Sequence, residues 1–76
     1  MSQRERAIAL GAAIRTAREK AGLSQEEVAR LVDLPPMSYG SIERGRLLPS
    51  VSTLTRLCVT LKIDPDNLPD LQDVRD

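Results

Sequence analysis

The sequence predicts an all-α protein, a compact bundle of four to five helices. Apolar residues recur at steps of three and four along most of the chain, which is the spacing of one helix face. No segment shows the alternation of apolar and polar residues that marks a half-buried strand. Residue types that start and stop helices, such as Ser, Asp, Pro and Gly, lie between the apolar segments.

The composition fits one small domain over residues 1–76 with an aliphatic core. The chain has a single aromatic side chain, Tyr39, and a single cysteine, Cys58. A chain of this size buries about 60% of the surface that its unfolded form exposes. Cys58 has no partner for an internal disulfide, which fits a reducing compartment. No apolar run approaches the ~20 residues that span a bilayer, so we expect a cytoplasmic protein.

Charge is distributed unevenly, although the net charge is zero. Residues 1–62 contain ten Lys/Arg and six Asp/Glu, whereas residues 63–76 contain one Arg and five Asp. The chain is therefore a mildly basic body followed by an acidic end, which includes a tail at about 69–76. A basic body of this kind suits nucleic-acid binding. A solvated surface with an acidic end is the alternative interpretation.

The first helix is predicted over about residues 4–21. Its apolar face consists of Leu10, Ile14, Ala17 and Ala21, and Gly22 follows where a left-handed cap is wanted. Two arginines near its start, Arg4 and Arg6, form either a basic arm or an ordinary solvated helix start.

A second, two-turn helix begins after Ser24. Glu27 lies three residues later, and this S-x-x-E spacing is a capping box, in which each side chain binds an amide that the helix start leaves open. Val28, Ala29 and Val32 form its predicted buried face.

The third helix is predicted at about residues 36–44, and two prolines fix its start. Proline disfavours helical geometry for the residue before it, so Leu34 and Pro35 are extended. Pro36 fits the first turn, where its missing N–H costs nothing. Tyr39 and Ile42 form the inner face, and Gly45 ends the helix.

The fourth helix is predicted at about residues 51–62, after Pro49 and Ser50. Its apolar stripe is Leu54, Leu57, Cys58 and Leu61. The Asp64-Pro65 pair then starts a short fifth helix or turn that continues to Leu68.

Several motifs combine in an order that resembles one known family. They are L-S-Q-E-E-V-A from Leu23, I-E-R-G from Ile42, the pair P-S, and L-x-x-L-C-x-x-L-x-I from Leu54. Over about residues 10–68 the chain resembles the lambda-repressor/Cro-like (XRE) helix-turn-helix proteins. The resemblance implies a helix-turn-helix at about 24–44, with helix 36–44 in the major groove of DNA.

The resemblance also implies roles for individual residues. The base-facing positions are Pro36, Met37, Gly40 and Ser41. The phosphate-contacting positions are Ser24, Gln25, Ser38, Arg44 and Arg46. Arg18 and Glu43 correspond to a partly buried ion pair between the first and third helices.

The base-facing positions depart from the polar residues common in the family. Only Ser41 can hydrogen-bond a base edge, and Met37 can touch a thymine methyl group. Gly40 permits a close backbone approach to a partner. Also, Asp33 stands where the family commonly has Gly at a positive φ. Either the protein binds DNA with little direct readout, or this surface binds a protein partner.

Four apolar residues, Leu31, Leu47, Leu48 and Val59, occupy positions that usually face solvent. They are either scattered surface residues or, for Leu47, Leu48 and Val59, parts of a homodimer interface. A two-fold dimer would place two recognition helices about one DNA turn apart.

Other function classes fit the sequence poorly. The chain has no histidine, so Ser-His and Cys-His nucleophiles are impossible, and no glycine-rich phosphate loop is present. A lone cysteine without histidine makes no zinc site, and single-stranded RNA binding lacks aromatic stacking platforms. We therefore expect a DNA-binding transcriptional regulator and neither an enzyme nor a cofactor-dependent protein. A regulatory protein is a further candidate partner. The alternative is a protein-interaction module, antitoxin-like or antirepressor-like, on the same scaffold.

Overall fold

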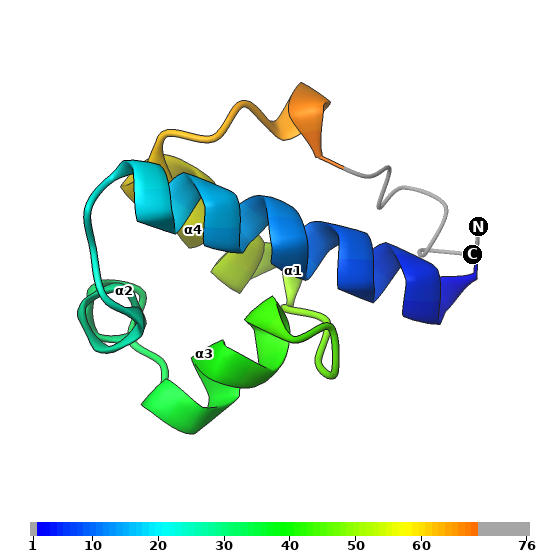
Figure 1. Cartoon of the computed structure of the whole chain (residues 1–76), viewed down its shortest axis with the longest axis horizontal. Coiled ribbons are helices and arrows are strands. Elements are labelled where there is room, and N and C mark those ends of the chain that lie inside the picture. Colours follow the sequence, from blue (N-terminus) through cyan, green and yellow to red (C-terminus); the bar gives the residue numbers. More distant parts are fainter. Residues whose placement is uncertain (1, 69–76) are drawn as a thin grey trace.

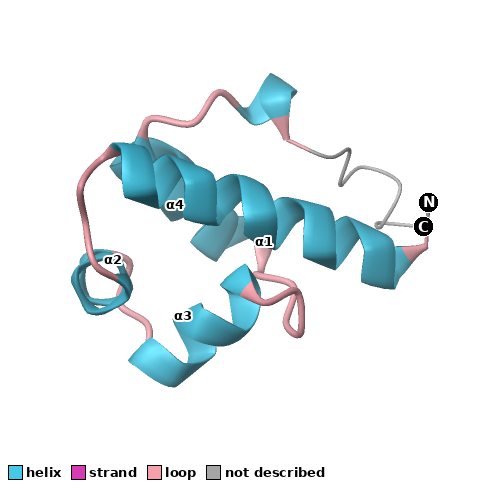
Figure 2. Ribbon diagram, in the orientation of Figure 1, coloured by secondary structure: helices cyan, strands magenta, loops and turns pink. Residues whose placement is uncertain are grey.

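The computed structural model describes residues 2–68, and within them the chain is a helical bundle (Figures 1 and 2). The elements in chain order are α1 (Gln3–Lys20), α2 (Gln25–Leu31), α3 (Pro36–Glu43), α4 (Val51–Leu61) and the 3₁₀ turn η1 (Pro65–Asn67). The long helix α1 crosses the middle of the molecule, with α3 on one side and η1 on the other. The all-α prediction is confirmed. The predicted acidic tail at 69–76 lies outside the described residues.

Helix α1 begins and ends at identifiable caps. Ser2 and Glu5 form a capping box that the sequence analysis did not identify: the Ser2 Oγ accepts from the Glu5 amide at 3.1 Å, and the Glu5 carboxylate accepts from the Ser2 amide at 2.8 Å. Gly22 ends the helix at φ 73°, as expected. The helix therefore starts at Gln3, and Arg4 is a helical residue rather than part of an arm.

The short helix α2 shows the predicted capping box of Ser24 and Glu27. The Ser24 Oγ accepts from the Glu27 amide at 3.0 Å, and the Glu27 carboxylate accepts from the Ser24 amide at 2.8 Å. The helix is followed by Asp33 at φ 61°, a left-handed conformation that Asp tolerates better than most residues. This single residue redirects the chain into α3.

Helix α3 starts as the two prolines dictate. Pro35 is the extended N-cap with ψ 142°, and its carbonyl accepts the first helical hydrogen bond, from the Tyr39 amide at 3.0 Å. At the other end Arg44 is the C-cap and Gly45 takes φ 75°. The helix is thus one residue shorter than predicted.

Helix α4 is capped by Ser50, whose Oγ accepts from the Thr53 amide at 3.1 Å. It ends at Lys62, which adopts φ 55° without being glycine. Asp64 then caps η1 by accepting from the Asp66 amide at 3.0 Å. No helix within residues 2–68 has the length and apolarity that crossing a membrane requires.

The core is aliphatic apart from Tyr39, which is fully buried. The predicted faces of the helices largely supply it, but Ala21 is exposed because it is the C-cap, where the chain turns away. The buried apolar residues are Ala7, Leu10, Ile14, Val28, Ala29, Val32, Tyr39, Ile42, Leu57, Cys58 and Leu61.

Candidate nucleic-acid interface

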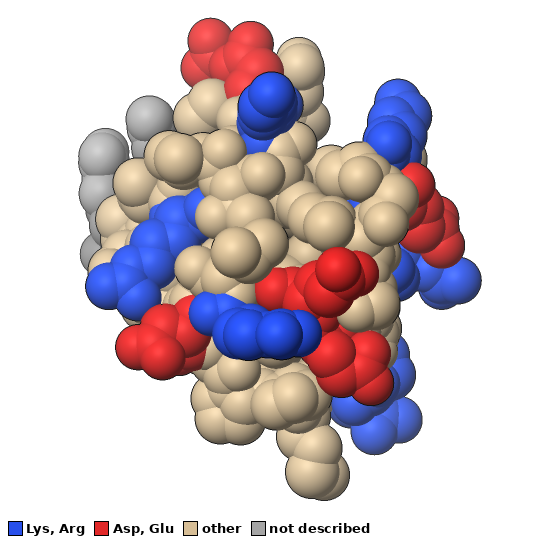
Figure 3. Space-filling model, turned by 90° about the vertical axis from the view of Figure 1, so that its left-hand side faces the viewer, with Lys and Arg blue, Asp and Glu red and all other residues tan. Residues whose placement is uncertain are grey.

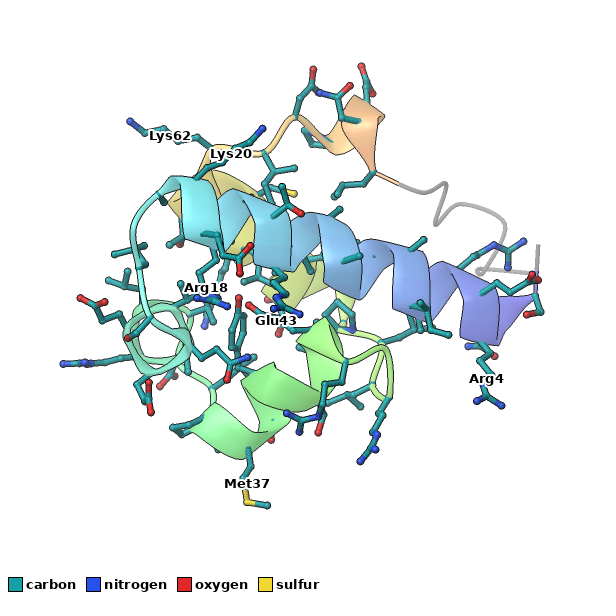
Figure 4. All side chains as sticks on the ribbon, viewed as in Figure 1. Arg4, Arg18, Lys20, Met37, Glu43 and Lys62 are labelled. Carbon is teal, nitrogen blue, oxygen red and sulfur yellow. The ribbon has the colours of Figure 1, made fainter. Side chains whose placement is uncertain are left out.

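The first half of α3 is the most protruding part of the predicted recognition surface. Pro36 is exposed and the Met37 side chain is 83% exposed, pointing away from the body of the protein (Figure 4). Ser38 and Ser41 are half-buried. A partner approaching α3 therefore meets an apolar tip first and hydroxyl groups behind it.

Gly40 is covered in this structure, so the expected close approach of a partner to its backbone requires the Arg44 side chain to move. Gly40 is buried, and a Cβ placed on it would lie 3.0 Å from Nη1 of Arg44. The side chain of Arg44, four residues later on the same helix face, covers the glycine. A ligand that approaches Gly40 therefore meets the guanidinium group of Arg44.

A polar cluster around Glu43 holds α3 against α1 and α2. Glu43 is 8% exposed and forms an ion pair with Arg18, whose Nε donates to its Oε2 at 2.7 Å and whose Nη2 donates to its Oε1 at 3.2 Å. Gln25 Nε2 donates to Oε1 at 2.9 Å, and the Tyr39 hydroxyl donates to Oε2. Arg18 also donates from Nη1 to the Leu23 carbonyl at 2.9 Å. Figure 4 shows Arg18 and Glu43 facing each other between α1 and α3.

The cluster keeps its charges in the folded state. Burial raises the pKa of the Glu43 carboxyl, but hydrogen bonds from Arg18, Tyr39 and Gln25 outweigh this effect and hold the pKa below its usual value. Burial, together with the Glu43 carboxylate, raises the pKa of the Tyr39 hydroxyl, which stays protonated and donating. In the described part of the chain every buried side-chain nitrogen or oxygen has a hydrogen-bond partner.

The predicted phosphate-contacting residues fall into two groups. The Ser24 hydroxyl serves the capping box and the Gln25 amide group binds Glu43, so both side chains already have internal partners. Arg44 and Arg46, by contrast, are exposed, and their side chains bind no described residue. The network thus explains Gln25 as a positioning residue, a role that the sequence alone did not reveal.

The apolar residues predicted at a dimer interface differ in exposure. Leu47 and Val59 are exposed, at 45% and 74%, but Leu48 packs against the core and is half-buried. Leu48 therefore contributes to the core, because the turn after α3 directs its side chain inward. Val51, which the sequence pattern did not single out, is 83% exposed and lies on the same helix as Val59, eight residues before it.

An apolar groove of about 290 Å³ runs along α4 between these exposed valines. Its lining includes Val51, Leu54, Cys58, Val59 and Ile63. Burial raises the pKa of the Cys58 thiol, which keeps it protonated and poorly reactive.

The end of the molecule formed by α2 carries charges of both signs. Figure 3 shows Lys/Arg and Asp/Glu side chains interspersed on this face, without a continuous basic patch. Helix α2 itself contributes Glu26, Glu27 and Arg30, all exposed. This face therefore offers no purely basic surface to a nucleic acid.

Comparison with known proteins gives three kinds of match. A family model described as a helix-turn-helix domain matches residues 9–71. The ImmF control region 10 kDa protein of Bacillus phage phi105 is 36% identical over 55 residues, which cover 72% of this chain and 61% of the phage protein.

Two crystal structures share the fold. The clp gene regulator ClgR from Corynebacterium glutamicum matches with a TM-score of 0.72 and 32% identity, covering 82% of this chain and 63% of ClgR. The restriction-modification controller protein C.AhdI from Aeromonas hydrophila matches with a TM-score of 0.73 and 33% identity, covering 79% of this chain and 91% of C.AhdI. The chain thus spans less than two thirds of the phage protein and of ClgR, but nearly all of C.AhdI.

Proposed function

The chain belongs to the helix-turn-helix family, and from this membership we propose that it is a sequence-specific regulator that binds double-stranded DNA as a dimer. In this proposal α3 enters the major groove and α2 crosses the phosphate backbone. The relatives with known roles are described as control or regulator proteins, which favours regulation over catalysis. The site of action is the cytoplasm of a bacterium, where operator DNA of a chromosome or phage lies.

The observation that carries the proposal is the polar cluster around Glu43. It joins α1 through Arg18, α2 through Gln25 and α3 through Tyr39, so that the exposed tip of α3 has a fixed orientation. A recognition helix must keep such an orientation, because base edges are read by groups placed to within fractions of an ångström. A charged network in so small a core stabilises little on balance, but it does specify geometry.

The chemistry of α3 indicates how the DNA would be bound. Ser41 is the one base-facing residue with a hydrogen-bonding side chain, and Met37 offers an apolar contact to a thymine methyl group. Affinity would therefore come mainly from arginine contacts to phosphates, such as those of Arg44 and Arg46. Sequence preference would come from DNA shape and from the spacing of two half-sites.

Dimerisation is proposed through α4. Val51 and Val59 are the two most exposed apolar side chains on this helix and border its apolar groove. A two-fold axis beside α4 would leave both α3 helices free to face one side of a duplex. The half-sites would then lie about 34 Å apart, one turn of B-DNA.

The test is fluorescence anisotropy with a labelled duplex from the region upstream of the gene, against a scrambled duplex of the same composition. The proposal expects tighter binding to the native duplex and a steep loss of affinity with salt. Equal affinity for both duplexes would contradict sequence specificity. Failure to bind either duplex at low salt would contradict DNA binding altogether.

A second candidate function is binding of a protein partner through the same surface, as an antitoxin or antirepressor does. The exposed Pro36 and Met37 tip favours it, because an apolar tip suits a protein groove better than a polar base edge. Absence of DNA binding together with a partner that protects Met37 from oxidation would support this candidate.

A further inference from the structure

A groove lined by three arginines lies beside the proposed recognition surface. It has a volume of about 520 Å³ and runs between the first two turns of α1 and the segment that follows α3. Arg4 and Ile8 line it from α1, and Arg44, Gly45 and Arg46 line it from the other side. These two segments are forty residues apart in the sequence, so only the fold brings the arginines together.

Two glycines determine how closely the walls of this groove approach. A Cβ on Gly45 would lie 2.7 Å from the Ile8 Cα, and Gly45 also needs φ 75°, which L side chains rarely adopt. A Cβ on Gly11 would lie 2.3 Å from the Ile42 carbonyl oxygen. The backbone of α1 is therefore in direct contact with the end of α3. Close packing of the backbone therefore sets where the main chain of Arg4 lies relative to that of Arg44 and Arg46.

The positive charge of the groove is not neutralised by the described residues. None of Arg4, Arg44 and Arg46 forms an ion pair or a side-chain hydrogen bond with residues 2–68, and all three are exposed. The nearest acidic residue in sequence, Glu5, has its carboxylate on the Ser2 amide at 2.8 Å. Glu43, next to Arg44, points inward to Arg18. Three unpaired guanidinium groups around one groove favour an anion with several acceptor oxygens.

We propose that this groove binds a phosphate group of the DNA backbone and that Arg4 completes the site. The proposal rests on the proposed function and extends it, because Arg4 lies outside the helix-turn-helix unit. Arg4 points to the same side of the molecule as Met37, whereas Lys20 and Lys62 lie at the opposite edge (Figure 4). DNA on the α3 side would thus pass Arg4.

The experiment compares the salt dependence of duplex binding for the wild type, Arg4→Gln and Arg56→Gln. Arg56 is an exposed arginine of α4, outside the groove, so its replacement changes net charge equally. Each phosphate contact contributes about 0.9 to the slope of log affinity against log salt. Arg4→Gln is expected to lower the slope by about 0.9 per bound chain, so that the affinity loss from 50 to 200 mM salt shrinks by about threefold. It should weaken native and scrambled duplexes equally, and Arg56→Gln should leave the slope unchanged.

The outcomes separate this proposal from the proposed function. A wild type that binds the native duplex, with Arg4→Gln and Arg56→Gln behaving alike, would overturn the Arg4 site and leave the regulator proposal standing. If the wild type binds no duplex, titration with inorganic pyrophosphate, followed by NMR of the arginine side chains, decides the matter. Shifts at Arg4, Arg44 and Arg46 that Arg4→Gln abolishes would support a phosphate site and overturn DNA as its source. The absence of such shifts would overturn the site itself.

Discussion

Replacing Glu43 with alanine removes the one group that four hydrogen bonds converge on. Arg18 donates two of them, and Gln25 and Tyr39 donate one each. After the substitution the guanidinium of Arg18, whose side chain is only 13% exposed, has no counter-charge in the described structure. Its remaining described partner is the Leu23 carbonyl. The perturbation is therefore the burial of an unpaired charge and of two unpaired neutral donors.

The size of the effect follows from these losses. Removing one partner of a buried ion pair costs about 3–5 kcal/mol. A domain of 76 residues has a free energy of unfolding of about 4–11 kcal/mol. Glu43→Ala should therefore remove about a quarter of the stability or more. Since a domain of this size loses about 4–8 °C of melting temperature per kcal/mol, the midpoint should fall on the order of 20 °C.

Thermal unfolding followed by circular dichroism measures this, with Glu19→Ala as the matched control. Glu19 also pairs with an arginine of α1, Arg15, at 3.3 Å, but both side chains are more than half exposed. An exposed pair contributes about 0–1 kcal/mol, so the control should shift the midpoint by a few degrees at most. Equal midpoints for the two variants would refute the reasoning, because they would mean that burial and convergence add nothing at Glu43.

Four further predictions test other parts of the structure. Acid should erase the stability advantage of the wild type over Glu43→Gln. Because folding lowers the Glu43 pKa, the stabilising effect of the carboxylate is complete above the ordinary value of 4.5 and is lost as pH falls through the folded value. A difference in melting midpoint between the two proteins that stays constant from about pH 6 to pH 3 would contradict this. Gly40→Ala should raise the free energy of unfolding by about 0.5–1 kcal/mol, because the flexible Arg44 side chain can move away from a methyl group, and a lower denaturant midpoint would count against it. Gly11→Ala should instead destabilise by at least about 1–3 kcal/mol, since its methyl group meets a backbone carbonyl, and an unchanged denaturant midpoint would show that α1 can move. Val59→Glu should shift sedimentation toward the monomer while leaving the melting curve of the monomer unaltered, and an unaffected dimer would place the interface elsewhere.

Local rules predicted most of the helix boundaries because the responsible atoms are near each other in the chain. The Ser24 capping box and the start of α3 after Pro35 each depend on a few consecutive residues, whereas the left-handed Asp33 was expected from the family resemblance. Local rules do not say which side chains cover one another. Leu48 was expected at an interface but packs against the core, and Gly40 was expected to face a partner but lies beneath the Arg44 side chain.

The candidate site was only partly predictable for the same reason. The Arg18–Glu43 ion pair came from resemblance to a family, since nothing in the local sequence marks a glutamate as buried. That Gln25 completes this network depends on how α2 meets α3. That Arg4 lies beside Arg44 depends on how α1 crosses the end of α3. This crossing is possible because Gly11 has no side chain, and a lone glycine within a helix gives no sign of which backbone it will meet.

The short length of α3 explains why an inward-facing carboxylate can matter for DNA binding. An isolated helix of eight residues is not stable in water, so α3 keeps its shape and direction only through its neighbours. Its start is fixed by the two prolines and its end by Glu43, while the next residue, Arg44, points outward. The anchor Glu43 and the proposed phosphate-binding residue Arg44 are thus consecutive, so we expect a loosening of Glu43 to displace Arg44 as well. Stability and DNA affinity should therefore fall together for changes in the Glu43 cluster, whereas changes at Arg4 should affect affinity alone.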